Sequence, residues 1–306
     1  SEPLYIDVVS SLAKMNRSAF VVGGRYGLGS KEFTPACVKA VLENLESENP
    51  KNNFTVGIVD DVTNLSLPLK DFHISHDNIE YKFFGLGSDG TVSANKNSIK
   101  IIGENTNKYT QGFFEYDSKK SGSITISHLR ISDTPIKSTY TLTNADFIAI
   151  HNYSFVGRYD VLKGLNAGGV VLLNTVLDQN GLSEDLPDYF VKALKDAKAK
   201  FYVLNAQKIA KDCGLGNKIN VIMQTAFFKL ANIMDYSKAV EAMKLAVKKT
   251  YGKKGDKVVK SNYNAIDSAL SGLVEIDVNA LKGKHYGERK ETDYYNNFIK
   301  PINELK

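Results

Sequence analysis

The feature that most constrains the fold is a regular alternation of short apolar runs with helix-like segments from residue 81 onward. The runs at 147–150, 169–173 and 201–204 are short and continuous, which is typical of strands buried on both faces. Alternating strands and helices predict an α/β domain whose mainly parallel sheet is covered by helices on both sides. The other elements expected here are strands at 109–116 and 123–132, and helices at 160–165, 187–198, 219–233 and, in two pieces linked by 250–255, within 236–273.

A glycine-rich turn lies where such a sheet binds ligands. Residues 81–84 are typical of a strand, Gly85 to Gly90 form the turn, and a helical pattern covers 91–102. Glycines let backbone N–H groups approach an anion, and the helix N-terminus adds about half a positive charge. Because ligands in open α/β sheets bind beyond the carboxyl ends of the strands, we expect a phosphorylated ligand at this turn.

The residues that follow the strand expected at 109–116 help to identify the phosphorylated ligand. Gly85-x-Gly87-x-x-Gly90 matches the dinucleotide fingerprint, but a lone match is weak evidence. The fingerprint of NAD sites adds an acidic residue about 20 positions on, for the ribose 2′-hydroxyl. Here Lys119 and Lys120 follow Asp117, and their ammonium groups suit a phosphorylated ribose, as in NADP or coenzyme A. A solvated turn that binds nothing is the open alternative for the two lysines.

The first part of the chain is thin for a domain of its own. Its expected elements are helices at 4–13 and 35–45 and strands at 19–22 and 54–59, with Thr34 as a helix cap and Pro35 at the first helical position. About 65 residues give a marginal core, so we interpret this part as half of a domain. The chain opens at Ser1 without an initiator Met, which suggests a cut inside a larger polypeptide. The polar stretch 71–80 is the expected boundary.

Composition excludes several classes of function. No apolar run approaches the ~18 residues of a membrane span, and no signal peptide opens the chain, so we expect a cytoplasmic protein without a membrane partner. Cys37 and Cys213 are too few for a disulfide framework or a cysteine-ligated cluster. The seven lysines between Lys244 and Lys260 are interpreted as a solvated helix face. They lack interleaved aromatic residues, so no nucleic-acid partner is expected.

Catalytic patterns are sparse. None of the five histidines forms the pair of a metalloprotease helix, and no G-x-S-x-G turn occurs. We therefore predict neither a catalytic residue nor a metal ligand on this chain.

Several long motifs resemble one family. They are the stretches 21–35, 84–92, 94–103, 117–122, 126–130, 216–220 and 223–228. These stretches resemble pyruvate:ferredoxin oxidoreductase, also called pyruvate synthase, and the resemblance runs through nearly the whole chain to about Val274.

The resemblance implies a fold, an activity and partners. It implies that residues 1–75 end a transketolase C-terminal-like domain, and that 76–306 form a Rossmann-like three-layer α/β/α domain of the gamma type, which binds coenzyme A. The family oxidatively decarboxylates pyruvate with coenzyme A, giving acetyl-CoA, CO₂ and reduced ferredoxin or flavodoxin. It uses thiamine diphosphate with Mg²⁺ and [4Fe–4S] clusters, and the parent enzyme is expected to be a homodimer.

The resemblance also implies a binding site. The implied coenzyme A contacts are Gly87, Ser88, Gly90, Thr91, Lys119, Lys120 and Asn217. Cluster cysteines and the thiamine-binding halves are absent, so this chain should bind coenzyme A and dock other domains without catalysing the reaction alone. Two alternatives stay open, namely a module of this domain type that binds NADPH or associates with sulfite reductase, and a purely structural docking domain.

Overall fold

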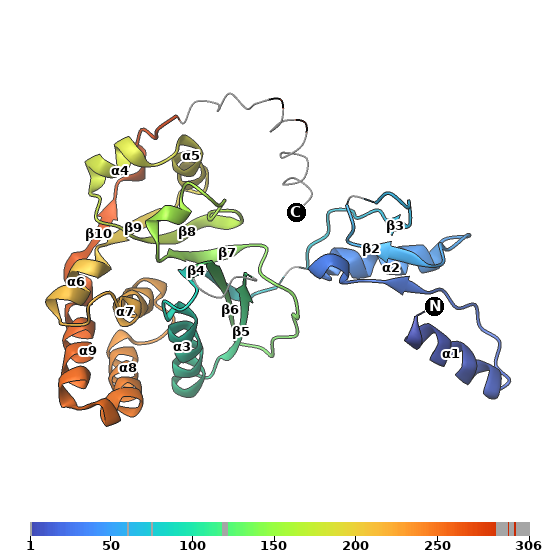
Figure 1. The fold of residues 1–306 in the computed structure, drawn as a ribbon, viewed down its shortest axis with the longest axis horizontal. Helices are drawn as coiled ribbons and strands as arrows, with labels where there is room; N and C mark the ends of the chain where they lie inside the picture. Colours follow the sequence, from blue (N-terminus) through green and yellow to red (C-terminus); the bar gives the residue numbers. More distant parts are fainter. Residues whose placement is uncertain are drawn as a thin grey trace. The chain divides into compact units, whose positions relative to one another are not determined.

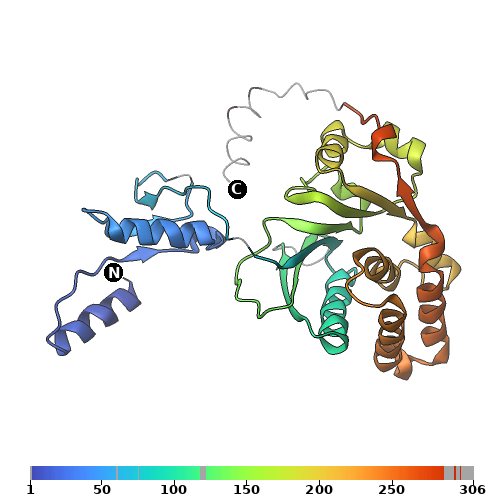
Figure 2. The same ribbon diagram turned by 180° about the vertical axis from the view of Figure 1, so that it is seen from behind.

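The computed structural model describes residues 2–59, 61–74, 76–117 and 122–285, together with Asp293 and Asn297. The described chain divides into two compact units, one built on the residues up to His76 and one that begins at Asp77 (Figures 1 and 2). Each unit has its own sheet and its own hydrophobic core.

The first unit is a small parallel α/β assembly. Its elements are α1 (Pro3–Lys14), β1 (Gly24–Arg25), α2 (Pro35–Glu46), β2 (Phe54–Val56) and β3 (Ser66–Leu67), with strand order β1-β2-β3. The expected cap of α2 is confirmed, because the Thr34 side chain accepts a hydrogen bond from the Cys37 amide and Pro35 opens the helix. Among the described residues of this unit, the buried core consists of Cys37, Ala40, Phe54, Val56 and Leu67.

Two strand predictions for this unit need correction. The strand expected at 19–22 lies instead at Gly24–Arg25, where Gly24 pairs with Phe54 of β2. A Cβ on Gly24 would lie 2.2 Å from the Phe54 ring, so only glycine permits this close pairing. The strand expected at 54–59 stops at Val56, because Gly57 takes a left-handed φ of 83°.

The second unit is built on a seven-stranded sheet of order β10-β9-β8-β7-β4-β6-β5 (Figure 1). The strands are β4 (Ile79–Leu86), β5 (Tyr109–Tyr116), β6 (Ile124–Ser132), β7 (Ala145–Ile150), β8 (Leu165–Asn174), β9 (Lys200–Leu204) and β10 (Leu273–Ile276). Neighbours among β4, β7, β8 and β9 pair in parallel, whereas β6 and β10 run the other way. Since β5 is antiparallel to β6, it shares the direction of the central strands, and the mainly parallel sheet is confirmed.

Helices cover both faces, which confirms the three-layer α/β/α prediction (Figures 1 and 2). One layer contains α3 (Thr91–Asn105), α6 (Ala206–Asp212), α7 (Asn220–Ala231), α8 (Tyr236–Tyr251) and α9 (Asp256–Ser268). The other contains α4 (Gln179–Asp185) and α5 (Asp188–Asp196). Successive residues of β7 alternate between the two cores, with Phe147 and Ala149 in one and Ile148 and Ile150 in the other. This two-residue period explains why the strand is apolar throughout.

One helix prediction in this unit is wrong. Residues 161–164 form a turn and Leu165 already begins β8, although Val161 and Leu162 are buried as a helix face would be. Gly164 has a left-handed φ of 78°, and a Cβ there would lie 1.9 Å from the Thr143 carbonyl oxygen. This tight turn interrupts any helix. The elements α4, α6 and β10 were not anticipated from the sequence.

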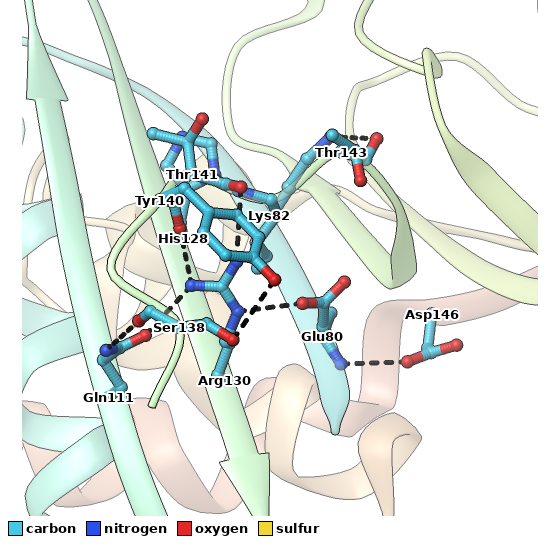
Figure 3. Close-up of polar contacts among 11 residues, drawn as sticks. Glu80, Lys82, Gln111, His128, Arg130, Ser138, Tyr140, Thr141, Thr143 and Asp146 are labelled. Carbon is cyan, nitrogen blue, oxygen red and sulfur yellow. Dashed lines mark hydrogen bonds and ion pairs between the residues drawn. The ribbon is translucent and has the colours of Figure 1, made fainter. Parts of the chain in front are cut away.

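A buried polar cluster attaches the segment 133–144 to the sheet (Figure 3). The Arg130 guanidinium donates to Glu80 Oε1 at 2.9 Å and to Gln111 Oε1 at 3.0 Å, on the strands that flank β6. It also donates to the backbone carbonyls of Tyr140 at 2.6 Å and Thr141 at 3.2 Å. One arginine on the central strand of the three thus joins both neighbouring strands to the covering segment.

Lys82 of β4 is a second buried cation beside Glu80, two residues further along the strand. Its Nζ donates to the backbone carbonyls of Thr143 at 3.1 Å and Lys163 at 3.4 Å. Burial lowers the pKa of Lys82, although nearby carboxylates such as Glu80 oppose the shift. The ammonium group therefore binds two loops to the sheet through carbonyl oxygens.

Candidate functional site

The glycine turn lies at the point where the sheet reverses its order. The chain leaves β4 through α3 toward β5 and β6 on one side, and then crosses to β7 on the other side. The carboxyl ends of the parallel neighbours β4 and β7 therefore lie side by side, with the turn directly after Leu86. Ligands of open α/β sheets bind at such a switch point.

The turn is held by its own backbone and by one carboxylate. The Gly87 amide donates to the Ser123 carbonyl at 2.7 Å, which ties the turn to the start of β6. Ser88 and Gly90 both take left-handed φ angles, of 73° and 88°. The Asp89 carboxylate accepts hydrogen bonds from the amide of Leu86 at 2.8 Å and from that of Thr91 at 2.7 Å.

Asp89 determines where an anion fits at this turn. Its carboxylate already accepts from the amide of the first residue of α3, and its negative charge repels an anion placed inside the turn. The amides of Val92 and Ser93 follow within the first helical turn, where no intrahelical acceptor exists. A phosphate is therefore best placed over Val92 and Ser93, beside the exposed Ser88, with the helix dipole behind it.

A cavity of about 590 Å³ opens at this place. It is lined by the turn, by the start of α3, and by the ends of β5 and β6 that adjoin it. Thr125 is among the lining residues, and its hydroxyl is buried with no hydrogen-bond partner in the part of the chain that the structure describes. An orphaned hydroxyl of this kind is costly unless a ligand or water satisfies it. Lys96 of α3 is a cation that also lines the cavity, and its Nζ lies 5.2 Å from the centre of the Phe114 ring.

A buried polar network supports the turn from below. Thr91 is fully buried, and its hydroxyl makes a 2.9 Å hydrogen bond with His151 Nδ1 at the end of β7. The His151 amide donates to the Phe84 carbonyl on β4 at 2.9 Å, and its carbonyl accepts from Asn174 Nδ2 on β8 at 2.9 Å. Burial lowers the pKa of His151 to about 4, so the imidazole is neutral near pH 7.

The structure brings only some of the predicted contacts together. Gly87, Ser88 and Gly90 line the cavity, whereas Thr91 supports the turn from inside the core. Lys119 and Lys120 lie outside the described residues. Asn217 is exposed in the turn between α6 and α7, and it is not among the residues that line the cavity.

The lining residues that sequence reasoning missed include three with polar side chains that bear on the site, namely Ser93, Lys96 and Thr125. Ser93 and Lys96 carried a detectable signal, because residues three apart on a helix share one face, and Ser93 directly follows the turn. Thr125 carried none, because its place beside Gly85 depends on the antiparallel pairing of β4 with β6.

The described residues lack two features that other functions would require. Within ranges 2–59, 61–74, 76–117 and 122–285, no group of three or more His, Cys, Asp or Glu side chains is placed to hold a metal ion. In the same part of the chain, no helix has the length and apolar character that a membrane crossing requires.

The fold and the site define the class of the second unit. It is a doubly wound α/β domain with a glycine turn at the switch point, the arrangement that binds phosphorylated ligands in such sheets. A model of the family described as "Pyruvate ferredoxin/flavodoxin oxidoreductase" matches residues 80–272, which is more than half of the chain. The chain belongs to this family.

Similarity to known proteins extends through both units. The chain is 51% identical over 313 residues to the pyruvate:ferredoxin oxidoreductase of Moorella thermoacetica, a match that covers 100% of this chain and 27% of that protein. The chain therefore spans about a quarter of the length of this relative.

Solved structures share the fold. Subunit PORC of pyruvate oxidoreductase from Thermotoga maritima superimposes with a TM-score of 0.51 at 21% identity, covering 65% of this chain and 99% of that one. A 2-oxoglutarate:ferredoxin oxidoreductase from Magnetococcus marinus, whose structure holds 2-oxoglutarate, coenzyme A and succinyl-CoA, superimposes with a TM-score of 0.50 at 15% identity. That match covers 69% of this chain and 33% of the other.

Proposed function

We propose that the second unit binds coenzyme A for a larger 2-oxoacid oxidoreductase. In that enzyme pyruvate and coenzyme A give acetyl-CoA and CO₂, and two electrons pass to ferredoxin or flavodoxin. The family membership of the chain supports the reaction, and the Magnetococcus marinus neighbour, which holds coenzyme A, supports the ligand. The role of this chain is to hold the coenzyme, and no catalytic residue is assigned to it.

The observation that carries the proposal is the cavity beside the glycine turn, whose lining includes Thr125, a residue with a buried hydroxyl that has no partner among the described residues. A ligand that reaches over the turn supplies a partner to this hydroxyl. Its pyrophosphate accepts from the amides of Val92 and Ser93 and lies within reach of Lys96, which offsets the charge of Asp89. The ribose phosphate that distinguishes coenzyme A from its dephosphorylated form is assigned to Lys119 and Lys120.

The redox cofactors of the family belong outside this chain in our proposal. A [4Fe–4S] cluster takes four cysteine thiolates, whereas this sequence contains only Cys37 and Cys213, one in each unit. The residues present do not fit a cluster, and no electron-transfer step is derived for them. Thiamine diphosphate and Mg²⁺ are likewise assigned to the remaining domains of the parent enzyme.

The first unit has a docking role in this proposal. We assign residues 1–75 to the end of a transketolase C-terminal-like domain and 76–306 to the coenzyme-binding gamma-type domain. The five-residue buried core of the first unit is consistent with completion by other parts of the enzyme. We further propose that the parent enzyme is a homodimer and that it is located in the cytoplasm.

Calorimetric titration of this chain with coenzyme A and with dephospho-coenzyme A tests the site. Replacing Lys119 and Lys120 by Ala should weaken coenzyme A roughly 10- to 100-fold, since hydrogen bonds to charged groups contribute about 1.5–3 kcal/mol, and should leave dephospho-coenzyme A unchanged. Lys192→Ala, an exposed position on α5 in the opposite helix layer, is the matched control.

Three results would count against this assignment. Equal losses for both ligands would remove the phosphate assignment. An absence of heat at millimolar coenzyme A would exclude a preformed site. Tighter binding of NADPH than of coenzyme A would favour a nicotinamide nucleotide module instead.

A further inference from the structure

His151 is a buried histidine that is not among the residues lining the cavity at the glycine turn. It follows Ile150, the last residue of β7, and so lies beside the switch point. The Phe83 ring of β4 meets the imidazole edge-on, with the ring centres 6.5 Å apart. Because a buried polar side chain is unfavourable unless its polar atoms have partners, the partners of this imidazole indicate what it does.

The side-chain partner of His151 is the first residue of α3. The Thr91 hydroxyl makes a 2.9 Å hydrogen bond with His151 Nδ1. The Thr91 amide donates to Asp89 Oδ1 at 2.7 Å. The Thr91 side chain also packs on β4, since a Cβ on Gly85 would lie 2.5 Å from Thr91 Oγ1. Three separate contacts therefore fix the residue at which α3 begins.

His151 is itself attached to the neighbouring strands through its backbone. Its amide donates to the Phe84 carbonyl on β4 at 2.9 Å, and its carbonyl accepts from Asn174 Nδ2 at the end of β8, also at 2.9 Å. The Asn174 side chain is buried, and its Oδ1 atom accepts from the Ala206 amide at the start of α6 at 3.1 Å. The imidazole thus projects from a cross-linked part of the sheet, and its bond to Thr91 ties the start of α3 to three parallel strands.

The amides assigned to the phosphate follow Thr91 directly. Val92 and Ser93 lie in the first turn of α3, where amides lack intrahelical acceptors. The directions of these two N–H groups depend on how Thr91 is held, because Thr91 is the first helical residue. A binding site needs its donors held within about 0.5 Å of the productive geometry. A side chain that fixes Thr91 therefore influences the affinity of the site without touching the ligand.

We propose that His151 is a positioning residue for the ligand site at the glycine turn, and that it acts through the hydroxyl of Thr91. The imidazole holds Thr91, Thr91 holds the first turn of α3, and the amides of Val92 and Ser93 then face the phosphate. Thr91 connects the helix to the sheet and is not itself a ligand contact. The inference rests on the proposed function and deepens it, because it identifies the residues that orient that site.

Calorimetric titration of coenzyme A into variants of this chain tests the inference. His151→Leu and Thr91→Val each remove the hydrogen bond, and each should weaken coenzyme A about tenfold. His151→Asn and Thr91→Ser should stay within about twofold of the unmodified chain. The Asn carboxamide places a polar atom where the imidazole has Nδ1, and serine keeps the hydroxyl. A role in packing alone would not be rescued by these two smaller side chains.

A double-mutant cycle separates positioning from ligand contact. Thr91→Val combined with His151→Leu should bind coenzyme A no more weakly than either single variant, because the same hydrogen bond is absent from all three. A direct contact between Thr91 and the ligand would make the two losses add. The matched control is Leu194→Ala, at a fully buried position of α5 in the opposite core, which should lower stability and leave the affinity unchanged.

Hydrogen exchange reports the same positioning without a ligand. The Ala94 amide donates to the Gly90 carbonyl at 3.0 Å, so its exchange rate follows opening of the first turn of α3. Exchange at Ala94 should be faster in His151→Leu and unchanged in His151→Asn.

The inference is overturned if His151→Leu binds coenzyme A like the unmodified chain, or if His151→Asn binds it as weakly as His151→Leu. Additive losses in the cycle, or unchanged exchange at Ala94 in His151→Leu, would overturn it as well. In each of these cases the unmodified chain still binds coenzyme A, so the proposed function survives. An unmodified chain that gives no heat with coenzyme A would instead refute the proposed function, and this inference with it.

Discussion

Replacing Arg130 by Met should destabilise the second unit by about 3–5 kcal/mol, the usual effect of breaking a buried ion pair by removing one partner. The side chains of Arg130 and Glu80 are only 3% and 6% exposed, and the Arg130 Nε donates to Glu80 Oε1 at 2.9 Å. Without the guanidinium, the buried Glu80 carboxylate loses the ion pair and the hydrogen bond that Arg130 supplies. The carbonyls of Tyr140 and Thr141 also lose their donor, so the covering segment 133–144 should loosen as well.

A double-mutant cycle separates the charge effect from the packing effect. Because Glu80→Met together with Arg130→Met removes both charges, the pair should be at least about 1 kcal/mol more stable than Arg130→Met alone. The measurement is urea unfolding followed by circular dichroism, with hydrogen exchange at β4 and β6 to assign the change to this unit. For a domain of this size the single variant should lower Tm by roughly 6–20 °C.

The outcome that refutes this reasoning is additivity. If the double variant loses the sum of the two single losses, Arg130 and Glu80 are not coupled, and the cluster acts only through packing. A loss below about 1 kcal/mol for Arg130→Met would show that water or another cation reaches Glu80.

Two further predictions concern the support of the glycine turn. A Cβ on Gly85 would lie 2.5 Å from Thr91 Oγ1, so Gly85→Ala should cost about 1–3 kcal/mol by overpacking, whereas Gly157→Ala, where nothing lies within 4 Å, should be neutral in urea unfolding. His151 has a folded-state pKa of about 4 against an ordinary value near 6.5, so its unfolded form binds the proton more readily. The neutral imidazole therefore contributes up to about 3 kcal/mol to the free energy of unfolding. This contribution is complete above pH 6.5 and is lost as the pH falls toward 4. His151→Asn should flatten that slope of stability against pH, and an unchanged slope would show that other groups cause it.

The course of most strands and helices was predictable because it rests on local pattern. The strand at 109–116 has the predicted bounds, and the helix that follows the glycine turn begins at the predicted Thr91. The prediction of a helix at 160–165 was wrong, and the reason lies in a contact with a distant part of the chain. A turn at Gly164 packs against Thr143, and this contact overrides the apolar spacing that favoured a helix.

The candidate site was predictable in part. Gly87, Ser88 and Gly90 could be found because a glycine turn between a strand and a helix is visible within a few residues of sequence. Thr125 could not be found, because it reaches the cavity only through the pairing of β6 with β4. Nor could the role of Thr91, whose hydrogen-bond partner His151 lies 60 residues further along the chain.

The sequence by itself determined the α/β class, the mainly parallel sheet, the glycine turn and the resemblance to one oxidoreductase family. All of these depend on hydrophobic periodicity or on short motifs, which act over neighbouring residues. Only the tertiary structure decided the order of the strands, the switch point between β4 and β7, the Arg130 cluster and the cavity beside the glycine turn. These features arise when segments far apart in the chain pack to bury apolar surface and satisfy polar groups, and no local pattern encodes which segments will meet.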